Sequence, residues 1–255
     1  MSANEKELIR VEDLHKSFGS LQVLKGVTEH VNHGEVVSVI GPSGGGKSTF
    51  LRCLNLLETP TSGKIYFEGT DITDKNVDIN LHRQKMGMVF QHFNLFPNMT
   101  IKKNITLAPT QLGLMSKEDA DKKALELLER VGLLDKADSY PDMLSGGQKQ
   151  RVAIVRALCM HPEILLFDEV TAALDPEMVR EVLDVILDLA AQGRTMIIVT
   201  HEMQFARAVA DRIIFLEGGK IQEDETPDEF FEHPKTDRAK KFLNTFTFES
   251  VKRDI

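Results

Sequence analysis

Short apolar runs separated by turns characterise the N-terminal part of the chain. Charged residues and glycine interrupt the runs at residues 8–11 and 23–27, which favours strands of an exposed antiparallel sheet. The run at residues 35–40 is almost continuously apolar and ends at Gly41, which is typical of a buried strand. After the turn residues at 59–63, residues 64–69 are expected to form another strand and a turn.

Helical spacing follows the glycine-rich stretch and dominates the middle of the chain. Apolar side chains at helical intervals predict a helix over residues 47–57. A second helix is expected over residues 116–134, because Ser116-Lys-Glu-Asp119 is similar to a capping box and Gly132 lies where a helix stop belongs. A third is expected over residues 148–160.

Strand-like and helical patterns alternate in the C-terminal part. Apolar runs near residues 164–167 and 195–199 alternate with helical patterns at 177–191 and 203–210, which indicates βαβ units and a parallel sheet. We therefore predict the α/β class and a single domain over residues 1–255. Its core comprises about residues 1–91 and 161–255, with an N-terminal antiparallel β subdomain, and its inserted helical subdomain about residues 92–160.

Charge and composition exclude several classes of function. The chain has 39 acidic and 31 basic residues, a net charge of −8, which argues against a nucleic-acid partner. Its apolar stretches are far shorter than the roughly 18 residues of a membrane span, and its N-terminus carries no apolar signal region. Cys53 and Cys159 have no zinc-binding spacing, so a cytosolic protein with two structural thiols is expected.

Residues 41–48, Gly-Pro-Ser-Gly-Gly-Gly-Lys-Ser, match the phosphate-loop pattern G-x-x-x-x-G-K-[ST] between a buried strand and a helix. Glycines allow backbone N–H groups to converge on phosphate oxygens, and the helix N-terminus attracts the anion. Lys47 is expected to reach the β- and γ-phosphates, and the Ser48 hydroxyl to bind Mg²⁺. The alternative is a turn without a ligand, and the loop alone does not separate a GTPase, a kinase and an ATPase. The candidate nucleotide-binding residues here are Gly41, Pro42, Ser43, Gly44, Gly45, Gly46, Lys47, Ser48 and Thr49.

A second glycine cluster, Leu144-Ser-Gly-Gly-Gln148, precedes the helix expected over residues 148–160. Exposed N–H groups, a hydroxyl and a helix N-terminus again favour an anion. The alternative is a plain helix N-cap at Ser145, which would leave the two glycines unexplained. One triphosphate does not obviously need two such cradles in one chain.

Two later strands end in polar residues. The run at 164–167 ends in Asp168 and Glu169, and two carboxylates at the polar end of a buried strand favour a cation or a reactive water, although acidic residues are also common in the first turn of a helix. The run at 195–199 is followed by Thr200 and His201. A lone histidine at a strand end is more often solvated or capped than functional.

Together the two glycine clusters make the chain similar to the ATP-binding subunit of an ABC transporter, with residues 144–148 matching the signature sequence of that family. The resemblance covers essentially the whole chain and implies a P-loop NTPase with ATP and Mg²⁺ as cofactors. It also implies a head-to-tail dimer with a second copy, in which the signature of one subunit closes over ATP held by the phosphate loop of the other. The signature residues in that contact are Ser145, Gly146, Gly147 and Gln148, with Ser145 and Gly147 on the γ-phosphate.

The resemblance also implies roles for residues outside the two clusters. Asp168 would hold Mg²⁺, usually through water, Glu169 would polarise the attacking water, and His201 would contact the γ-phosphate and hold Glu169 in line. Gln91 would touch Mg²⁺ and the water, and would couple the site to the membrane partner. Lys47, Glu169 and His201 are therefore the expected catalytic residues, and Ser48, Gln91 and Asp168 the expected metal ligands.

Two further positions match the family less strictly. Asp175 resembles the D-loop aspartate that meets the other subunit, and Phe18 the aromatic that stacks on adenine, although Phe18 also fits a core position. The chain departs from the common pattern at Gly45, usually Ser, and at Val170, usually Pro.

The resemblance finally implies a transport function. Residues 93–97 and 106–109 are similar to polar amino-acid uptake ATPases, so import of a small polar solute, most of all an amino acid, is expected. The partners would be transmembrane permease subunits and, indirectly, an extracytoplasmic solute-binding protein, with the chain at the cytoplasmic face of the cell membrane. An exporter, a lipoprotein-release system or a non-transport P-loop NTPase are the alternatives.

Overall fold

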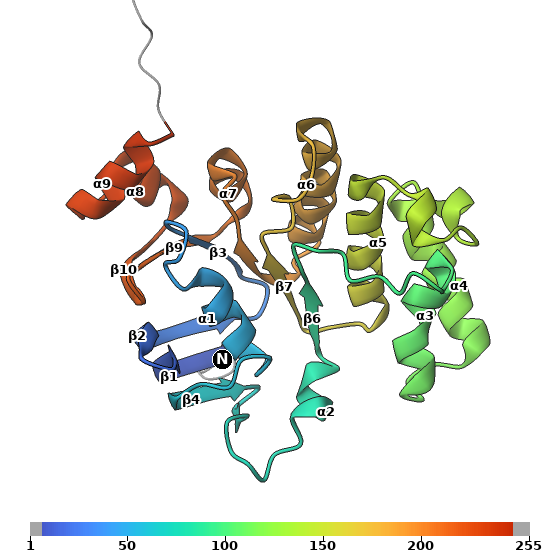
Figure 1. The fold of residues 1–255 in the computed structure, drawn as a ribbon, viewed down its shortest axis with the longest axis horizontal. Helices are drawn as coiled ribbons and strands as arrows, with labels where there is room; N and C mark the ends of the chain where they lie inside the picture. The colour runs from blue at the N-terminus through green and yellow to red at the C-terminus, as the bar shows by residue number, and fades with distance from the viewer. Residues whose placement is uncertain (1–6, 247–255) are drawn as a thin grey trace, which may run out of the picture.

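The computed structural model describes residues 7–246 and contains two sheets with helices around them (Figure 1). The antiparallel sheet has the order β2-β1-β4-β5, formed by β1 (Glu7–Phe18), β2 (Leu21–Asn32), β4 (Ser62–Phe67) and β5 (Thr70–Asp71). The second sheet has the order β10-β9-β3-β8-β7-β6, formed by β10 (Lys220–Glu225), β9 (Arg212–Glu217), β3 (Val36–Ile40), β8 (Thr195–Val199), β7 (Ile164–Asp168) and β6 (Met86–Val89). Its strands are parallel except for β10, which pairs antiparallel with β9.

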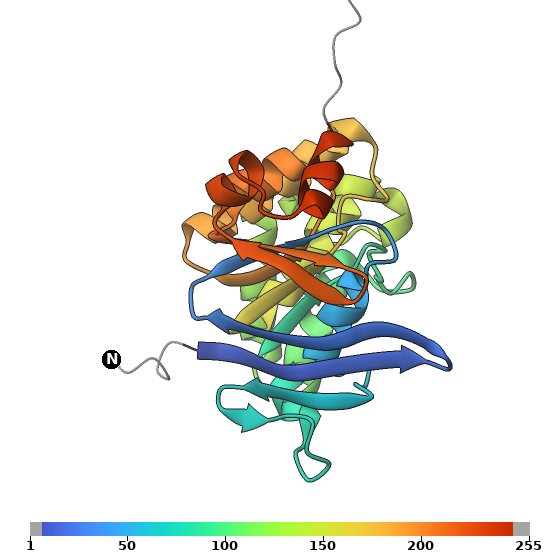
Figure 2. The ribbon, with the colours of Figure 1, turned by 90° about the vertical axis from the view of Figure 1, so that its left-hand side faces the viewer.

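Apolar cores cover both faces of the parallel sheet. Leu165 and Phe167 of β7 face the core shared with helix α5 (Gly146–Cys159), whereas Ile164 and Leu166 face the core shared with helix α1 (Lys47–Leu54) and the antiparallel sheet. This alternation explains the unbroken apolar runs of these strands, since side chains of both parities are buried. Helix α1 contacts β2, β7 and β8 and so lies between the two sheets (Figure 2).

Except for α2 (Ile79–Arg83), which packs on the core of α1 and the antiparallel sheet, the remaining helices lie on the other face and at one end of the parallel sheet. Helices α3 (Ile101–Gln111) and α4 (Lys117–Arg130) pack on each other and on α5, and α5 also contacts α6 (Pro176–Ala191) and β6. The other helices are α7 (Met203–Val209), α8 (Pro227–Glu232) and α9 (Asp237–Asn244). Ser116 and Ser145 cap α4 and α5 through their side chains. The hydroxyl groups thus satisfy helix N–H groups that have no partner inside the helix.

The expected α/β fold with a parallel sheet and an N-terminal antiparallel part is confirmed, with differences in extent. β1 continues to Phe18, well beyond the run at residues 8–11. Helix α1 ends at Leu54 and not at residue 57, because Leu56 takes a left-handed backbone conformation, φ 53°. The division at residues 91/92 and 160/161 stays a prediction, and its outer ends at 1–6 and 247–255 lie outside the described residues.

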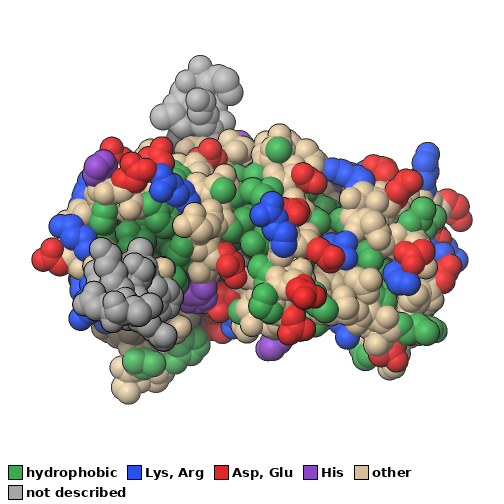
Figure 3. Space-filling view, turned by 90° about the horizontal axis from the view of Figure 1, so that it is seen from above, with side chains coloured by type: hydrophobic (Ala, Val, Ile, Leu, Met, Phe, Trp, Pro, Cys, Tyr) green, Lys and Arg blue, Asp and Glu red, His purple; other side chains and the backbone are tan. Residues whose placement is uncertain are grey.

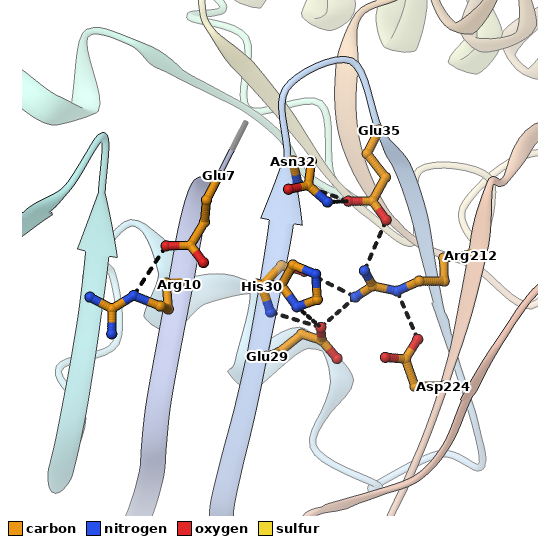
Figure 4. A network of polar contacts seen from close by, with 8 residues as sticks. All are labelled: Glu7, Arg10, Glu29, His30, Asn32, Glu35, Arg212 and Asp224. Carbon is orange, nitrogen blue, oxygen red and sulfur yellow. Dashed lines mark hydrogen bonds and ion pairs between the residues drawn. The ribbon is translucent and has the colours of Figure 1, made fainter. Parts of the chain in front are cut away.

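A network around Arg212 of β9 joins the two sheets (Figure 4). The Arg212 guanidinium pairs with Glu29 of β2, with Glu35 at 2.9 Å and with Asp224 of β10 at 2.8 Å, and it donates to the carbonyl of His30 at 3.0 Å. Glu29 is buried. One cation therefore holds carboxylates from both sheets in place.

Surface charge is mixed in sign. On the face shown in Figure 3, lysine and arginine side chains alternate with acidic ones among the described residues, and no continuous basic area forms there. Between residues 7 and 246, no helix combines the length and apolar character that a bilayer crossing requires.

Candidate active site

The glycine-rich loop lies at the carboxyl end of β3 and opens onto a cavity of about 400 Å³. The lining residues are Leu21, Val23, Ser43, Gly44, Gly45, Gly46, Lys47, Ser48, Thr49 and Glu169. Gly46 precedes helix α1 with φ 104°, a conformation that disfavours any residue with a Cβ. The N-terminus of α1 therefore faces the cavity, where its backbone N–H groups favour an anion.

Gly45 packs closely against main chain. A Cβ at this position would lie 2.9 Å from the Leu216 carbonyl oxygen of β9 and 3.0 Å from the Pro42 carbonyl oxygen. The Gly45 N–H also donates to Pro42 at 3.1 Å. The glycine at this departure from the common family pattern thus fits a tight loop.

Lys47 is buried and its ammonium lies inside the loop. Its Nζ donates to the carbonyl oxygens of Gly41 at 3.0 Å and Pro42 at 3.1 Å, and lies 3.9 Å from Glu169 Oε1. Burial lowers the pKa of Lys47, while the charges of Glu169 and Asp168 oppose that shift. An ammonium has three N–H donors, so one remains available for a phosphate oxygen.

Asp168, at the end of β7, is 1% exposed, and only one of its two carboxylate oxygens has a hydrogen-bond partner. Its Oδ2 accepts hydrogen bonds from Arg52 Nη2 at 2.9 Å and Nε at 3.1 Å. Its buried Oδ1 has no hydrogen-bond partner among residues 7–246. An unpaired buried carboxylate oxygen costs free energy unless a cation or a water binds it, so Asp168 fits a ligand of a hydrated Mg²⁺.

Glu169 and His201 form a pair beside the phosphate loop. His201 Nε2 lies 3.0 Å from Glu169 Oε1, and because a carboxylate only accepts, Nε2 carries the proton. This hydrogen bond, with help from the charges of His201, Lys47 and Arg52, lowers the pKa of Glu169 against the opposing effect of burial. Glu169 is therefore ionised at neutral pH and can accept a proton from water.

The signature residues begin helix α5 as a true capping box. The Ser145 hydroxyl accepts from the Gln148 N–H at 3.3 Å, and the Gln148 Oε1 accepts from the Ser145 N–H at 3.0 Å. A Cβ at Gly147 would lie 2.9 Å from Met178 Cβ of α6. Within one chain Ser145 thus acts as a helix N-cap. Close packing against Met178 explains why position 147 is a glycine. Among residues 7–246, no hydrogen bond or ion pair joins residues 145–148 to the phosphate loop of the same chain.

The other predicted residues lie around the edge of the site. Gln91 follows β6, which pairs with β7, so it leaves the sheet beside Asp168. Asp175 precedes α6 and its exposed side chain makes no cap hydrogen bond. Phe18 is 46% exposed, which rules out the core interpretation, and Lys16 Nζ lies 4.5 Å from its ring centroid.

Three residues of the site escaped sequence reasoning. Leu21 and Val23 line the cavity from β2, and Arg52 pairs with Asp168. Only the spacing Ser48/Arg52, one helical turn, offered a signal, because it places both side chains on one face of α1. The position of β2 beside the phosphate loop depends on tertiary contacts that no local sequence pattern encodes.

A buried parallel sheet, a phosphate loop at its carboxyl end, and a carboxylate–histidine pair beside that loop define a P-loop nucleotide-hydrolysing protein. The model of the family described as "ABC transporter" matches residues 24–172. The chain belongs to this family and is one of its ATP-binding subunits, an ATPase.

Relatives and solved structures agree with this assignment. The chain is 56% identical to the arginine transport ATP-binding protein ArtM of Bacillus subtilis, covering 92% of this chain and 98% of ArtM. It is 53% identical to the glutamine transport ATP-binding protein GlnQ of Geobacillus stearothermophilus, covering 93% and 98%. The structure of the dimeric ATP-binding cassette MJ0796 with ADP and Pi is similar, with a TM-score of 0.77 and 37% identity over 86% of this chain and 99% of that one.

Proposed function

We propose that two copies of this chain sandwich two ATP molecules head to tail, and that their hydrolysis drives uptake of a polar amino acid. The observation that carries the proposal is the convergence of Lys47, Glu169 and His201 at the cavity of the phosphate loop. In this arrangement Lys47 holds the terminal phosphates, Glu169 accepts a proton from the attacking water, and His201 keeps Glu169 oriented.

The cation is proposed to bind between Ser48 and Asp168, with Gln91 reaching it from the adjacent strand end. When bound, Mg²⁺ neutralises charge that develops on the phosphate oxygens. The unpaired Oδ1 of Asp168 and the Ser48 side chain at the cavity supply oxygen ligands of the kind this ion prefers. The ion pair with Arg52 holds the Asp168 carboxylate in place.

The remaining predicted residues are proposed to contact the ATP held by the partner copy or the adenine of the bound nucleotide. Ser145, Gly146, Gly147 and Gln148 present a helix N-terminus to the partner's γ-phosphate, and Asp175 lies exposed where the partner would approach. Phe18, exposed at the end of β1, offers a face for stacking on adenine. The dimeric MJ0796 structures support this assembly.

Amino-acid import is proposed from the relatives. ArtM and GlnQ are named for arginine and glutamine transport, and GltL of Escherichia coli, 53% identical over 92% of this chain and 98% of GltL, is named for glutamate/aspartate import. These names favour uptake over an exporter or lipoprotein-release system. The chain would work at the cytoplasmic face of the cell membrane on permease subunits, with an extracytoplasmic binding protein selecting the solute and no nucleic-acid partner.

The test is ATP-driven uptake in a reconstituted system. The chain is purified with its membrane subunits, placed in vesicles with the solute-binding protein, and given Mg-ATP and radiolabelled arginine, glutamine or glutamate. We expect uptake of at least one of them with the unmodified chain and none with Lys47→Ala, which removes the ammonium from the phosphate loop. ATP hydrolysis without uptake of any amino acid would refute the import assignment but not the ATPase.

A further inference from the structure

Lys16, near the end of β1, is largely buried although its ammonium is charged, since only 12% of its side chain is exposed. Its Nζ donates to the Thr59 carbonyl oxygen at 2.8 Å and lies 3.1 Å from Glu58 Oε2. Both partners follow helix α1, and Thr59 is 43 positions away from the lysine in the sequence. The ammonium therefore ties the end of β1 to the turn after α1.

The same ammonium lies over the ring of Phe18, 4.5 Å from the ring centroid. Lys16 and Phe18 are two residues apart on one strand, a spacing that places side chains on the same face. A cation in this position is attracted by the electron-rich face of the ring. An aromatic ring has two faces, so the ammonium occupies one and leaves the other for a base.

The turn that holds the ammonium continues directly from the phosphate-loop helix. The Leu56 N–H donates to the Cys53 carbonyl oxygen at 2.9 Å, and the Glu58 N–H to the Arg52 carbonyl oxygen at 3.1 Å. Most of α1 is buried in the core that it shares with the antiparallel sheet. A packed segment thus runs from the phosphate loop, at the N-terminus of α1, to the ammonium over Phe18.

The end of β1 has further bonds to the chain after α1 that do not involve the lysine side chain. The Ser17 N–H donates to Thr61 Oγ1 at 2.9 Å, and the Thr61 N–H donates to the His15 carbonyl oxygen at 2.8 Å. These bonds hold the strand itself. Substitution of Lys16 therefore releases the Phe18 ring without detaching β1.

We propose that Lys16, held by Glu58 and Thr59, is a positioning residue that fixes the Phe18 ring relative to the phosphate loop before the nucleotide binds. A ring that is already ordered spares the nucleotide the cost of ordering it, which is worth about two- to tenfold in affinity. The effect of Lys16 passes through Phe18. The inference rests on the proposed function, since that function assigns the adenine to Phe18.

The test compares ATP with tripolyphosphate, which has the phosphates but no base. Lys16→Met keeps most of the side-chain length and removes the charge. We expect the Kd for Mg-ATP, measured by titration calorimetry, to rise about two- to tenfold and the Kd for tripolyphosphate to stay the same. Lys16→Arg, which keeps a cation for the ring, should restore most of the ATP affinity. A general disturbance of the fold would weaken the binding of both ligands.

A second lysine in the same sheet supplies the matched control. Lys64 of β4 also lies over the ring of the aromatic residue two positions later, Tyr66, at 5.9 Å from the centroid. It also pairs with a carboxylate, that of Asp71, at 3.0 Å. None of these three residues lines the cavity of the phosphate loop. Lys64→Met should therefore leave the Kd values for both ligands unchanged.

A double-mutant cycle shows whether the lysine acts through the ring. Phe18→Leu should weaken ATP binding, and adding Lys16→Met to it should cause no further loss. If Lys16→Met fails to fold, Glu58→Gln, which loosens the ammonium without removing it, should show a smaller loss that is again confined to ATP. Unchanged ATP affinity in these variants, an equal loss for tripolyphosphate, or additive losses in the double variant would overturn the inference.

Phe18→Leu by itself separates this inference from the function on which it rests. If Phe18→Leu weakens ATP binding and Lys16→Met does not, the adenine contact stands and only the positioning role is refuted. If Phe18→Leu binds ATP as tightly as the unmodified chain, the adenine contact of the proposed function is refuted. Lys16 then has no base contact to position, and the inference fails with it.

Discussion

Glu169 combines a left-handed backbone with an ionised side chain. Its φ is 49°, and its N–H donates to the Val199 carbonyl oxygen at 3.0 Å. The next residue, Val170, stands where the family commonly has proline, and it is buried in the core. The buried Val170 side chain thus holds the turn at Glu169 in place, which in other members the rigid proline ring would do. A strained non-glycine residue held by its surroundings is a frequent feature of active sites.

The first prediction concerns the role of this carboxylate. Glu169→Gln removes the proton acceptor but leaves Lys47 and the glycine loop, so kcat should fall about 10²–10⁴-fold while ATP still binds. Light scattering should show an accumulating ATP-bound dimer. Glu163→Gln, exposed before the start of the same strand, is the matched control and should hydrolyse ATP normally. Hydrolysis by Glu169→Gln at the unmodified rate would show that another group is the base.

At the scale of elements, the contact between β2 and β9 includes a buried carboxyl group, that of Glu29. Burial raises the pKa of Glu29 to about 7, although the nearby Arg212 charge opposes the shift. The folded protein therefore binds a proton at Glu29 more tightly than the unfolded chain does. The contribution of protonated Glu29 to the free energy of unfolding is complete below about pH 4.5 and is lost as the pH rises towards 7.

The higher pKa of Glu29 in the folded protein predicts how stability depends on pH. Between pH 5 and pH 8, the free energy of unfolding of the unmodified chain should fall more than that of Glu29→Gln, by about 2–3 kcal/mol, because glutamine does not ionise. Urea denaturation at the two pH values measures both. Glu118→Gln, exposed in the first turn of α4, should behave as the unmodified chain. Parallel stability curves for Glu29→Gln and the unmodified chain would contradict the burial argument.

At the scale of the molecule, the phosphate loop and the signature are two separate proposed anion sites. The first follows β3 and the second begins α5, and within residues 7–246 no hydrogen bond or ion pair joins them. Two complementary halves that are not joined within one chain favour a symmetric dimer with two composite sites.

Mixing two defective subunits tests this assembly. Lys47→Ala disables the phosphate loop, and Ser145→Arg places a bulky side chain at the signature. Each variant alone should be inactive, whereas a mixture should regain activity, because one mixed pair contains one composite site with both halves intact. The steady-state ATPase rate measures the recovery. A mixture as inactive as its components would place both halves in the same chain.

The sequence determined the elements and the chemistry that depend on neighbours along the chain. Unbroken apolar runs specified buried strands, and glycine spacing specified the phosphate loop, because local backbone freedom decides both. Three features were settled only by tertiary structure: the pair of Arg52 with Asp168, the entry of Leu21 and Val23 into the cavity, and the bonds of the Lys16 ammonium to Glu58 and Thr59. Each joins groups far apart in sequence, and their meeting depends on how sheets and helices pack, which no periodicity records.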